Sequence, residues 1–253
     1  MEMGWTGVAA LLGVGVLAGA LNVLAGGGSF LSLPLLIFLG LPPTVANGTN
    51  RIAILLQNAV AVWRFRSHGL VDRSWILLAG APAAGGAVLG AWGATAIGDE
   101  AFRRVLAGLM VLAVLWILWD PAGGRRTGTT IAPEGAARRA GLGAAFFAVG
   151  VYGGFVQAGV GFLLAAVALG MGLDLVRGNA LKVLVVLVAT PLSLAIFAWS
   201  GKVDWAAGVP LAVGNLLGAL VGVHLTVLKG HVWIKRFVTV SVVAFALKLW
   251  LAP

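Results

Sequence analysis

The chain has 253 residues; 60% are hydrophobic and only 10% are charged, and the mean hydropathy is +1.04. Because a soluble globular protein carries about 25% charged residues, this composition predicts a protein with many membrane segments and no separate soluble domain. The net charge of +9 does not indicate a nucleic-acid partner, since most Lys and Arg lie in a few loops between apolar runs. With no cysteine and three histidines far apart in sequence, we expect neither a metal ion nor a cofactor.

The first half begins with an apolar run at residues 5–25, long enough to cross ~30 Å of hydrocarbon as a helix. No Lys or Arg precedes Arg51, so this run is not a signal peptide and should remain a membrane segment. Glycines follow it, and residues 30–39 then form an apolar run that would reach only about 15 Å. The short run predicts a half-membrane helix or one arm of a re-entrant hairpin. Three further spans are expected at residues 45–65, 75–97 and 102–119.

The second half repeats this plan after a polar connector at residues 120–139. Its apolar segments lie at residues 140–157, 162–172, 178–199, 205–228 and 232–251. An offset of 132 residues aligns the halves without a gap, and the informative matches are polar residues or glycines: Asn47 with Asn179, Asp72 with Asp204, Gly86 with Gly218, and Gly90 with Gly222. Such matches indicate an internal repeat.

Basic loops set the expected orientation. The loop Arg64–Arg73, the connector 120–139 and the loop that begins at Lys229 are rich in Lys and Arg, so we place them inside the cell. The loops around Asp99 and Lys202 lack such an excess and are placed outside, which puts both termini outside. The predicted fold is therefore all-α: two inverted-topology repeats in the membrane, residues 1–119 and 140–253, joined by a cytoplasmic linker, residues 120–139. Each repeat has a broken or re-entrant helical hairpin plus three transmembrane helices, roughly eight to ten membrane segments in all.

Two glycine-rich breaks, Gly26–Ser29 and Ala158–Gly161, interrupt the apolar segments at equivalent places. Non-helical backbone at membrane depth is tolerated only where it is buried in protein or lines a cavity. A helix that begins at each break would point its free N–H groups at a shared central place, where they could cradle an anion. The candidate substrate-binding residues lie in or near the breaks: Gly26, Gly27, Gly28, Ser29, Asn47, Asn50, Arg51, Gln157, Gly159, Gly161, Asn179 and Lys182.

Each of these residue types also has a purely structural interpretation. Glycines can serve close helix packing, amides can hydrogen-bond between helices, and Arg51 and Lys182 can extend their charges to the membrane interface. A buried cation in a membrane is usually functional, and Arg51 has no acidic residue within about twenty positions, which favours an anion as its partner. Asp72 and Asp204 are expected to cap helices rather than to relay protons.

The run AGGGSFLSLPLLIFLGLPPTVANGTN (residues 25–50) resembles the first-repeat signature of the sulfite exporter TauE/SafE family of membrane permeases. The run QAGVGFLLAAVALGMGLDLVRGNALKVLV (residues 157–185) is similar to its second copy, and the resemblance extends over nearly the whole chain. It implies transport of sulfite, organosulfonates or related small organic anions across the cytoplasmic membrane. The second break lacks the triple glycine of the first, so symmetry of the site is not carried over.

These observations predict a secondary transporter of small anions in the cytoplasmic (inner) membrane, with no catalytic residue and with its site at the two breaks near the midplane. A passive anion channel is one alternative. Another is an intramembrane serine hydrolase built on Ser29, which would need a base within hydrogen-bond reach. Because no acidic residue stands alone in mid-segment, the sequence assigns no coupling proton or sodium ion; it assigns no oligomeric state either.

Overall fold

The computed structural model describes residues 4–24, 26–119 and 135–229, and this part of the chain is helical without a strand. The first half contains α1 (Trp5–Leu24), α2 (Ser29–Phe38), α3 (Pro43–Ser67), the π-helix η1 (Ile76–Gly80), α4 (Ala81–Ala96) and α5 (Asp99–Trp119). The second half contains α6 (Ala136–Phe155), α7 (Val160–Gly170), α8 (Leu175–Trp199) and α9 (Trp205–Lys229). The span predicted at residues 232–251 and most of the connector lie outside the described residues.

The prediction of an all-helical protein is confirmed. Four described segments are long and apolar enough to cross a membrane: Trp5–Leu24, Ile76–Ala96, Leu175–Trp199 and Trp205–Thr226. One boundary differs from the prediction, because α6 begins at Ala136 and not at residue 140. The extra residues include Arg138 and Arg139. Their charges favour assignment to the polar connector, although arginine is a good helix former.

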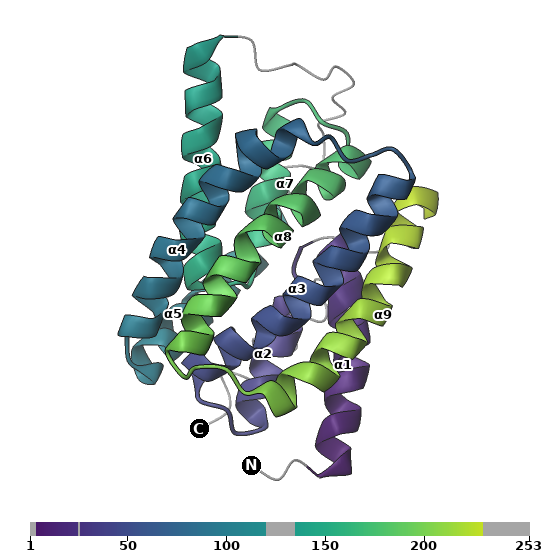
Figure 1. Cartoon of the computed structure of the whole chain (residues 1–253). Helices are drawn as coiled ribbons and strands as arrows, with labels where there is room; N and C mark the ends of the chain where they lie inside the picture. Colours follow the sequence, from purple (N-terminus) through teal and green to yellow (C-terminus); the bar gives the residue numbers. More distant parts are fainter. Residues whose placement is uncertain (1–3, 25, 120–134, 230–253) are drawn as a thin grey trace.

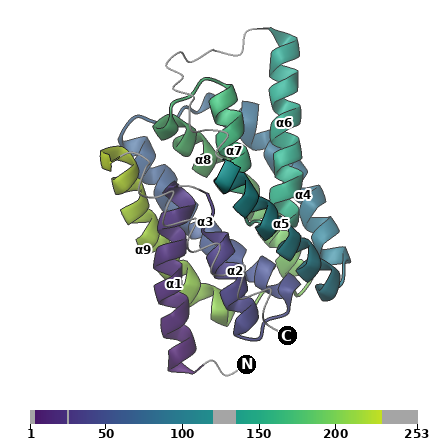
Figure 2. The same cartoon turned by 180° about the vertical axis from the view of Figure 1, so that it is seen from behind.

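The helices of the two halves correspond at the predicted offset. Adding 132 to the bounds of α3 gives 175–199, the bounds of α8, and the same offset maps α1 and α2 onto α6 and α7 to within one residue. In Figure 1, α1 rises from the lower end of the molecule, whereas α6 descends from the upper end. The short helices turn back at the centre, α2 toward the lower end and α7 toward the upper end (Figures 1 and 2).

The two halves are interleaved. α1 packs most extensively on α9, and α6 packs in the equivalent way on α4. Glycines permit both crossings: a Cβ added to Gly218 of α9 would collide with the carbonyl oxygen of Val16, and one added to Gly86 of α4 with that of Phe147. Small residues at close crossings are typical of membrane helices. The sequence match between Gly86 and Gly218 therefore reflects one contact that is made twice.

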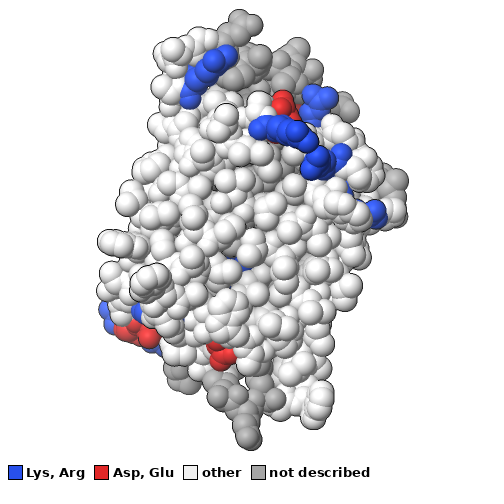
Figure 3. All heavy atoms as spheres, viewed as in Figure 1, with Lys and Arg blue, Asp and Glu red and all other residues white. Residues whose placement is uncertain are grey.

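Charged side chains gather at the two ends of the molecule, and the broad band between them is almost free of charge on the face shown in Figure 3.

Asp72 accepts a hydrogen bond from the Ser74 amide at 2.8 Å, and Asp204 accepts one from the Ala207 amide at 3.0 Å, so both cap helix starts as predicted.

Asp99, at the start of α5, ties that helix to α3. It accepts hydrogen bonds from the Thr44 amide at 2.9 Å and from the Thr44 hydroxyl at 2.7 Å. Partial burial acts to raise the pKa of Asp99, but these two bonds and the charge of Lys202 hold the pKa below its ordinary value. The contact therefore fixes the lower end of the first half with a carboxylate that stays charged.

Candidate functional site

The two glycine-rich breaks meet at the centre of the molecule. One lies between the end of α1 and the start of α2, and the other between the end of α6 and the start of α7. Gly26 (φ 87°) and Gly159 (φ 78°) have the left-handed backbone that glycine adopts without strain. Gly26 and Gly161 approach so closely that a Cβ added to either would overlap the backbone of the other. The breaks therefore touch through bare backbone.

An aromatic pair covers this contact. The rings of Phe30 and Phe162 stack with centroids 6.5 Å apart and an interplanar angle of 20°. The pairing is reciprocal, because Phe30 lies against Gly159 and Phe162 lies against Gly27. The sequence predicts an anion cradle between the helix starts, and this ring pair and the backbone contact lie between those starts in this structure.

Arg51, on α3, is fully buried beside the second break. Its guanidinium donates to the carbonyl oxygens of Gly153 at 3.3 Å and Gly154 at 2.5 Å, close to the end of α6. It also donates to Gln157 Oε1 at 3.3 Å and to Ser193 Oγ at 2.8 Å. The positive charge thus neutralises the negative end of the α6 dipole.

The rest of the Arg51 environment is uncharged. The guanidinium carbon lies 4.5 Å from the centroid of the Phe197 ring, a cation–π contact. Its Nε atom donates no hydrogen bond within the described part of the chain. The ion pairs found among the described residues involve Glu100 and Asp174, both exposed, and not Arg51. Within the described residues, the charge of Arg51 is therefore balanced by hydrogen-bonded dipoles and an aromatic ring.

Lys182, on α8, has the equivalent place at the first break. It is buried, and its ammonium donates to the Val23 carbonyl oxygen at 2.7 Å and to Asn179 Oδ1 at 2.8 Å. The Asn179 side-chain amide in turn donates to the Leu24 carbonyl oxygen at 3.4 Å, where α1 ends. Asn47 makes the matching bond in the other half, from its amide to the Phe155 carbonyl oxygen at 2.9 Å. Each half therefore holds the end of the other half's first helix.

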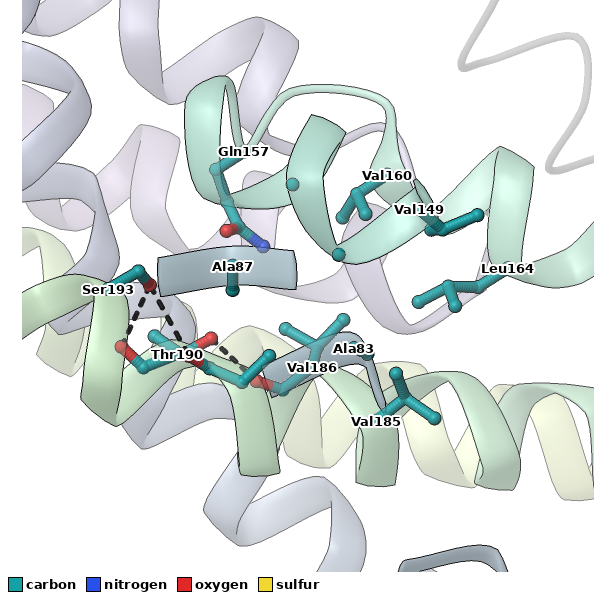
Figure 4. Close-up of a pocket in the computed structure, with 13 residues that line it drawn as sticks. Ala83, Ala87, Val149, Gln157, Val160, Leu164, Val185, Val186, Thr190 and Ser193 are labelled. Carbon is teal, nitrogen blue, oxygen red and sulfur yellow. Dashed lines mark hydrogen bonds between the residues drawn. The ribbon is translucent and has the colours of Figure 1, made fainter. Parts of the chain in front are cut away.

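A small cavity lies between α4, α6, α7 and α8 (Figure 4). Its volume is about 20 Å³, room for about one water molecule. Three of the four groups that accept hydrogen bonds from Arg51 line it: Gly153, Gln157 and Ser193. In Figure 4, Gln157 points inward from one side, and Ser193 and Thr190 lie on the opposite side. Alanines and valines form most of the remaining wall.

In the first half, buried polar side chains near the first break hydrogen-bond to one another. Asn50 donates to Ser29 Oγ at 3.1 Å and accepts from the Ser32 hydroxyl at 2.6 Å. Asn22 donates to Gln57 Oε1 at 3.2 Å, and these side chains are buried. The two halves thus share a backbone plan but differ in the polar groups that fill it.

The polar residues among the predicted site residues fall into three groups, and the glycines pack at the breaks. Gln157 lines the cavity and accepts a hydrogen bond from Arg51. Asn47, Asn179 and Lys182 hold helix ends. Ser29 and Asn50 hydrogen-bond to each other. Gly26 and Gly161 form the backbone contact, while Gly27 and Gly159 receive the aromatic rings and Gly28 packs against Ala18. Sequence reasoning missed Thr190 and Ser193. Their signal was two hydroxyls flanking Pro191 inside an otherwise apolar span.

Ser29 is bonded to an asparagine, which is not a base, and the described residues contain no cluster of three or more His, Cys, Asp or Glu side chains that could hold a metal ion. The site offers hydrogen-bond donors and one fixed positive charge. These groups suit the binding of a small anion.

Apolar helices around a buried polar centre define a polytopic integral membrane protein with the architecture of a transporter. The chain matches the sulfite exporter TauE/SafE family over residues 11–249, and it belongs to this family of membrane transporters. It is 27% identical to a "Probable membrane transporter protein" of Haemophilus influenzae, covering 95% of this chain and 93% of the relative. It is 30% identical to "Probable membrane transporter protein YfcA" of Escherichia coli K12, covering 93% and 87%. These names denote transporters and not enzymes, and no solved structure matches the chain.

Proposed function

We propose that this protein is a secondary transporter that carries a small oxyanion, sulfite or an organosulfonate, across the cytoplasmic membrane by alternating access. The observation that carries the proposal is the cavity formed around the hydrogen-bond partners of Arg51. Sulfite and sulfonate oxygens accept several N–H and O–H donors at once, and a guanidinium presents such donors in a planar fork.

Binding would proceed by exchange of partners. An anion oxygen takes the place of Gln157 Oε1 and Ser193 Oγ on Arg51, while the bonds to the Gly153 and Gly154 carbonyls keep the guanidinium in position. The Gln157 side-chain amide then donates to the same anion, and the Ser193 hydroxyl does so by rotating away from the Thr190 carbonyl oxygen, to which it donates at 3.0 Å in this structure. Because a cavity of about 20 Å³ is smaller than sulfite, the helices around it must separate for binding.

Two inverted repeats supply the motion. The matched helix bounds, the opposite directions of α1 and α6, and the reciprocal packing of α1 on α9 and α6 on α4 support an inverted repeat with boundaries near residues 119 and 140. Inverted repeats with broken helices at the centre are a common plan of transporters that expose one site to each side in turn. The closed contact between Gly26 and Gly161 favours such a cycle over a passive channel.

The charge distribution supports the orientation predicted from the sequence. Lys and Arg gather at the upper end of Figure 3, which holds the loops after α3 and α7. We place that end in the cytoplasm, so that α1 begins outside. The C-terminus is not among the described residues. Counting the predicted membrane segments places it on the extracytoplasmic side, like the N-terminus.

The test is transport by purified protein in proteoliposomes. Labelled sulfite should accumulate against its gradient when a driving ion gradient is imposed, and unlabelled sulfoacetate or taurine should compete if sulfonates share the site. Sulfate and small carboxylates define the limits of selectivity. Flux that only equilibrates the anion would support the channel, and no saturable flux of any of these anions would overturn the proposed function.

A further inference from the structure

The centre of the protein holds two cations that differ in one chemical respect. Arg51 and Lys182 both neutralise the carbonyl end of a helix at a break, α6 in one case and α1 in the other. A guanidinium stays protonated under all physiological conditions, whereas an amine taken out of water can exchange its proton. One half therefore has a fixed charge, and the other has a charge that can be removed.

Building on the proposed function, we propose that Lys182 carries a proton through the transport cycle and thereby couples movement of the anion to movement of protons. Lys182 Nζ lies within hydrogen-bonding distance of the Val23 carbonyl oxygen and of Asn179 Oδ1, so in its ammonium form Lys182 donates to both and holds the end of α1. A neutral amine would hold this end far less strongly, because the charge–dipole attraction is lost.

The surroundings leave Lys182 as the proton-exchanging group at this depth within the described chain. Of the helices packed on α8, the described α1, α4, α7 and η1 contain no titratable side chain. Titratable groups occur on the remaining helices. α3 has Arg51, Arg64 and Arg66. α6 has Arg138, Arg139 and Tyr152, and the start of α8 has Arg177 beside Asp174. Tyr152 is engaged through its hydroxyl with the Ala158 carbonyl oxygen at 2.7 Å. The described neighbours of Lys182 therefore include no carboxylate at the break.

The step balances without a further reactant. When the site opens to one side, water reaches Lys182; the ammonium gives one proton to a water molecule, which becomes hydronium, and a neutral amine remains. When the site opens to the other side, the amine takes a proton from hydronium there. Because the end of α1 leads directly into the break before α2, the loss or gain of this proton acts on the same backbone that contacts Gly161.

Proton and anion fluxes measured in the same proteoliposomes test this inference. With the membrane potential clamped, one proton coupled to each anion makes a gradient of one pH unit sustain about a tenfold anion gradient. The vesicles contain a pH-sensitive dye, and sulfite is the anion. We expect wild-type protein to move protons in proportion to sulfite and Lys182→Arg, which keeps a permanent charge at the end of α1, to lose proton movement at least tenfold.

Lys202→Gln is the matched control, since Lys202 lies outside the membrane centre, and it should retain both fluxes. Sulfite transport by wild-type protein without any response to a pH gradient would overturn the coupling while leaving the proposed function intact. Proton flux retained in Lys182→Arg would overturn the role of Lys182.

If Lys182→Arg is unstable, Lys182→Gln is tested in the same way. It should give downhill sulfite flux with no proton movement, and retained proton movement would again overturn the role of Lys182. Absence of sulfite flux in wild-type protein would overturn the proposed function itself, and this inference with it.

Discussion

At the scale of single residues, Arg51 has two sets of hydrogen-bond partners with different roles. The carbonyls of Gly153 and Gly154 hold Arg51 in place, and Gln157 and Ser193 occupy the donors that an anion would use. An arginine with neutral partners keeps its attraction for an anion, whereas a carboxylate partner would compete. In the proposed site the guanidinium is thus positioned in advance, and binding needs an exchange of its partners together with separation of the surrounding helices.

Substitution of Arg51 should separate charge from hydrogen-bond geometry. Arg51→Met leaves the α6 carbonyls without a donor, so we expect the unfolding free energy to fall by about 3 kcal/mol or more. Arg51→Lys keeps the charge but not the fork, and should stay folded while binding sulfite at least tenfold more weakly. Thermal unfolding in detergent and equilibrium binding measure the two effects. Undiminished sulfite binding in Arg51→Lys would exclude a direct contact of the guanidinium fork with the anion.

The Ser193 hydroxyl should matter for binding more than for folding. Ser193→Ala removes one partner of Arg51 and one wall group of the cavity, and should weaken sulfite binding about tenfold, the loss expected for one hydrogen bond to a charged group. Ser200→Ala on the same helix is the control, because its exposed hydroxyl bonds only to the Ile196 carbonyl oxygen in the described structure. Equal effects of the two substitutions would remove Ser193 from the site.

At the scale of helices and breaks, contact between bare backbones decides the geometry. Gly161 lies in the first turn of α7, where alanine would ordinarily favour the helix by up to about 1 kcal/mol. A Cβ at this place would overlap the backbone of Gly26, so the local preference and the tertiary contact oppose each other. The contact is expected to prevail, because neither backbone can move without shifting a helix start.

Two glycine substitutions in α7 test this ranking. Gly161→Ala should lower the thermal midpoint and reduce sulfite flux at least tenfold. Gly170→Ala, near the end of the same helix where an added Cβ meets no atom within 4 Å, should leave both unchanged or slightly raise the midpoint. A stabilised and fully active Gly161→Ala protein would show that the two breaks do not need to touch.

At the scale of the whole molecule, the two halves are interleaved, so movement of a helix in one half also moves the helix of the other half on which it packs. The end of α1 is hydrogen-bonded to Lys182 of the second half, and the end of α6 to Arg51 of the first half, so each cation links the two halves. Because the chain has no cysteine, single introduced cysteines can report the orientation of each half in the membrane.

Single cysteines at the equivalent ends of α3 and α8 test the inverted topology. Ser67→Cys and Ser200→Cys both replace exposed residues. With inverted repeats, an impermeant maleimide should label Ser200→Cys in intact cells and Ser67→Cys only after the membrane is opened. Labelling of both from the same side would contradict the inversion.

Much of this architecture follows from the sequence, because apolar length and glycine matches at one offset report local helices and their repetition. Arg51, Lys182 and Gln157 could be singled out because charge and amide groups are costly in lipid. The pairing of Lys182 with the end of α1, the stacking of Phe30 on Phe162 and the cavity at Ser193 could not. These features depend on contacts between residues more than a hundred positions apart, which residue spacing along one chain does not encode.

The central claim is that a small oxyanion binds beside Arg51, and the most direct measurement is a crystal structure of the protein with selenite, the heavy-atom analogue of sulfite. The anomalous signal of selenium locates the anion without assumptions about its pose. The account predicts a single strong peak within hydrogen-bonding reach of Arg51, Gln157 and Ser193. A peak elsewhere in the protein, in a preparation that transports selenite, with none beside Arg51, would contradict it.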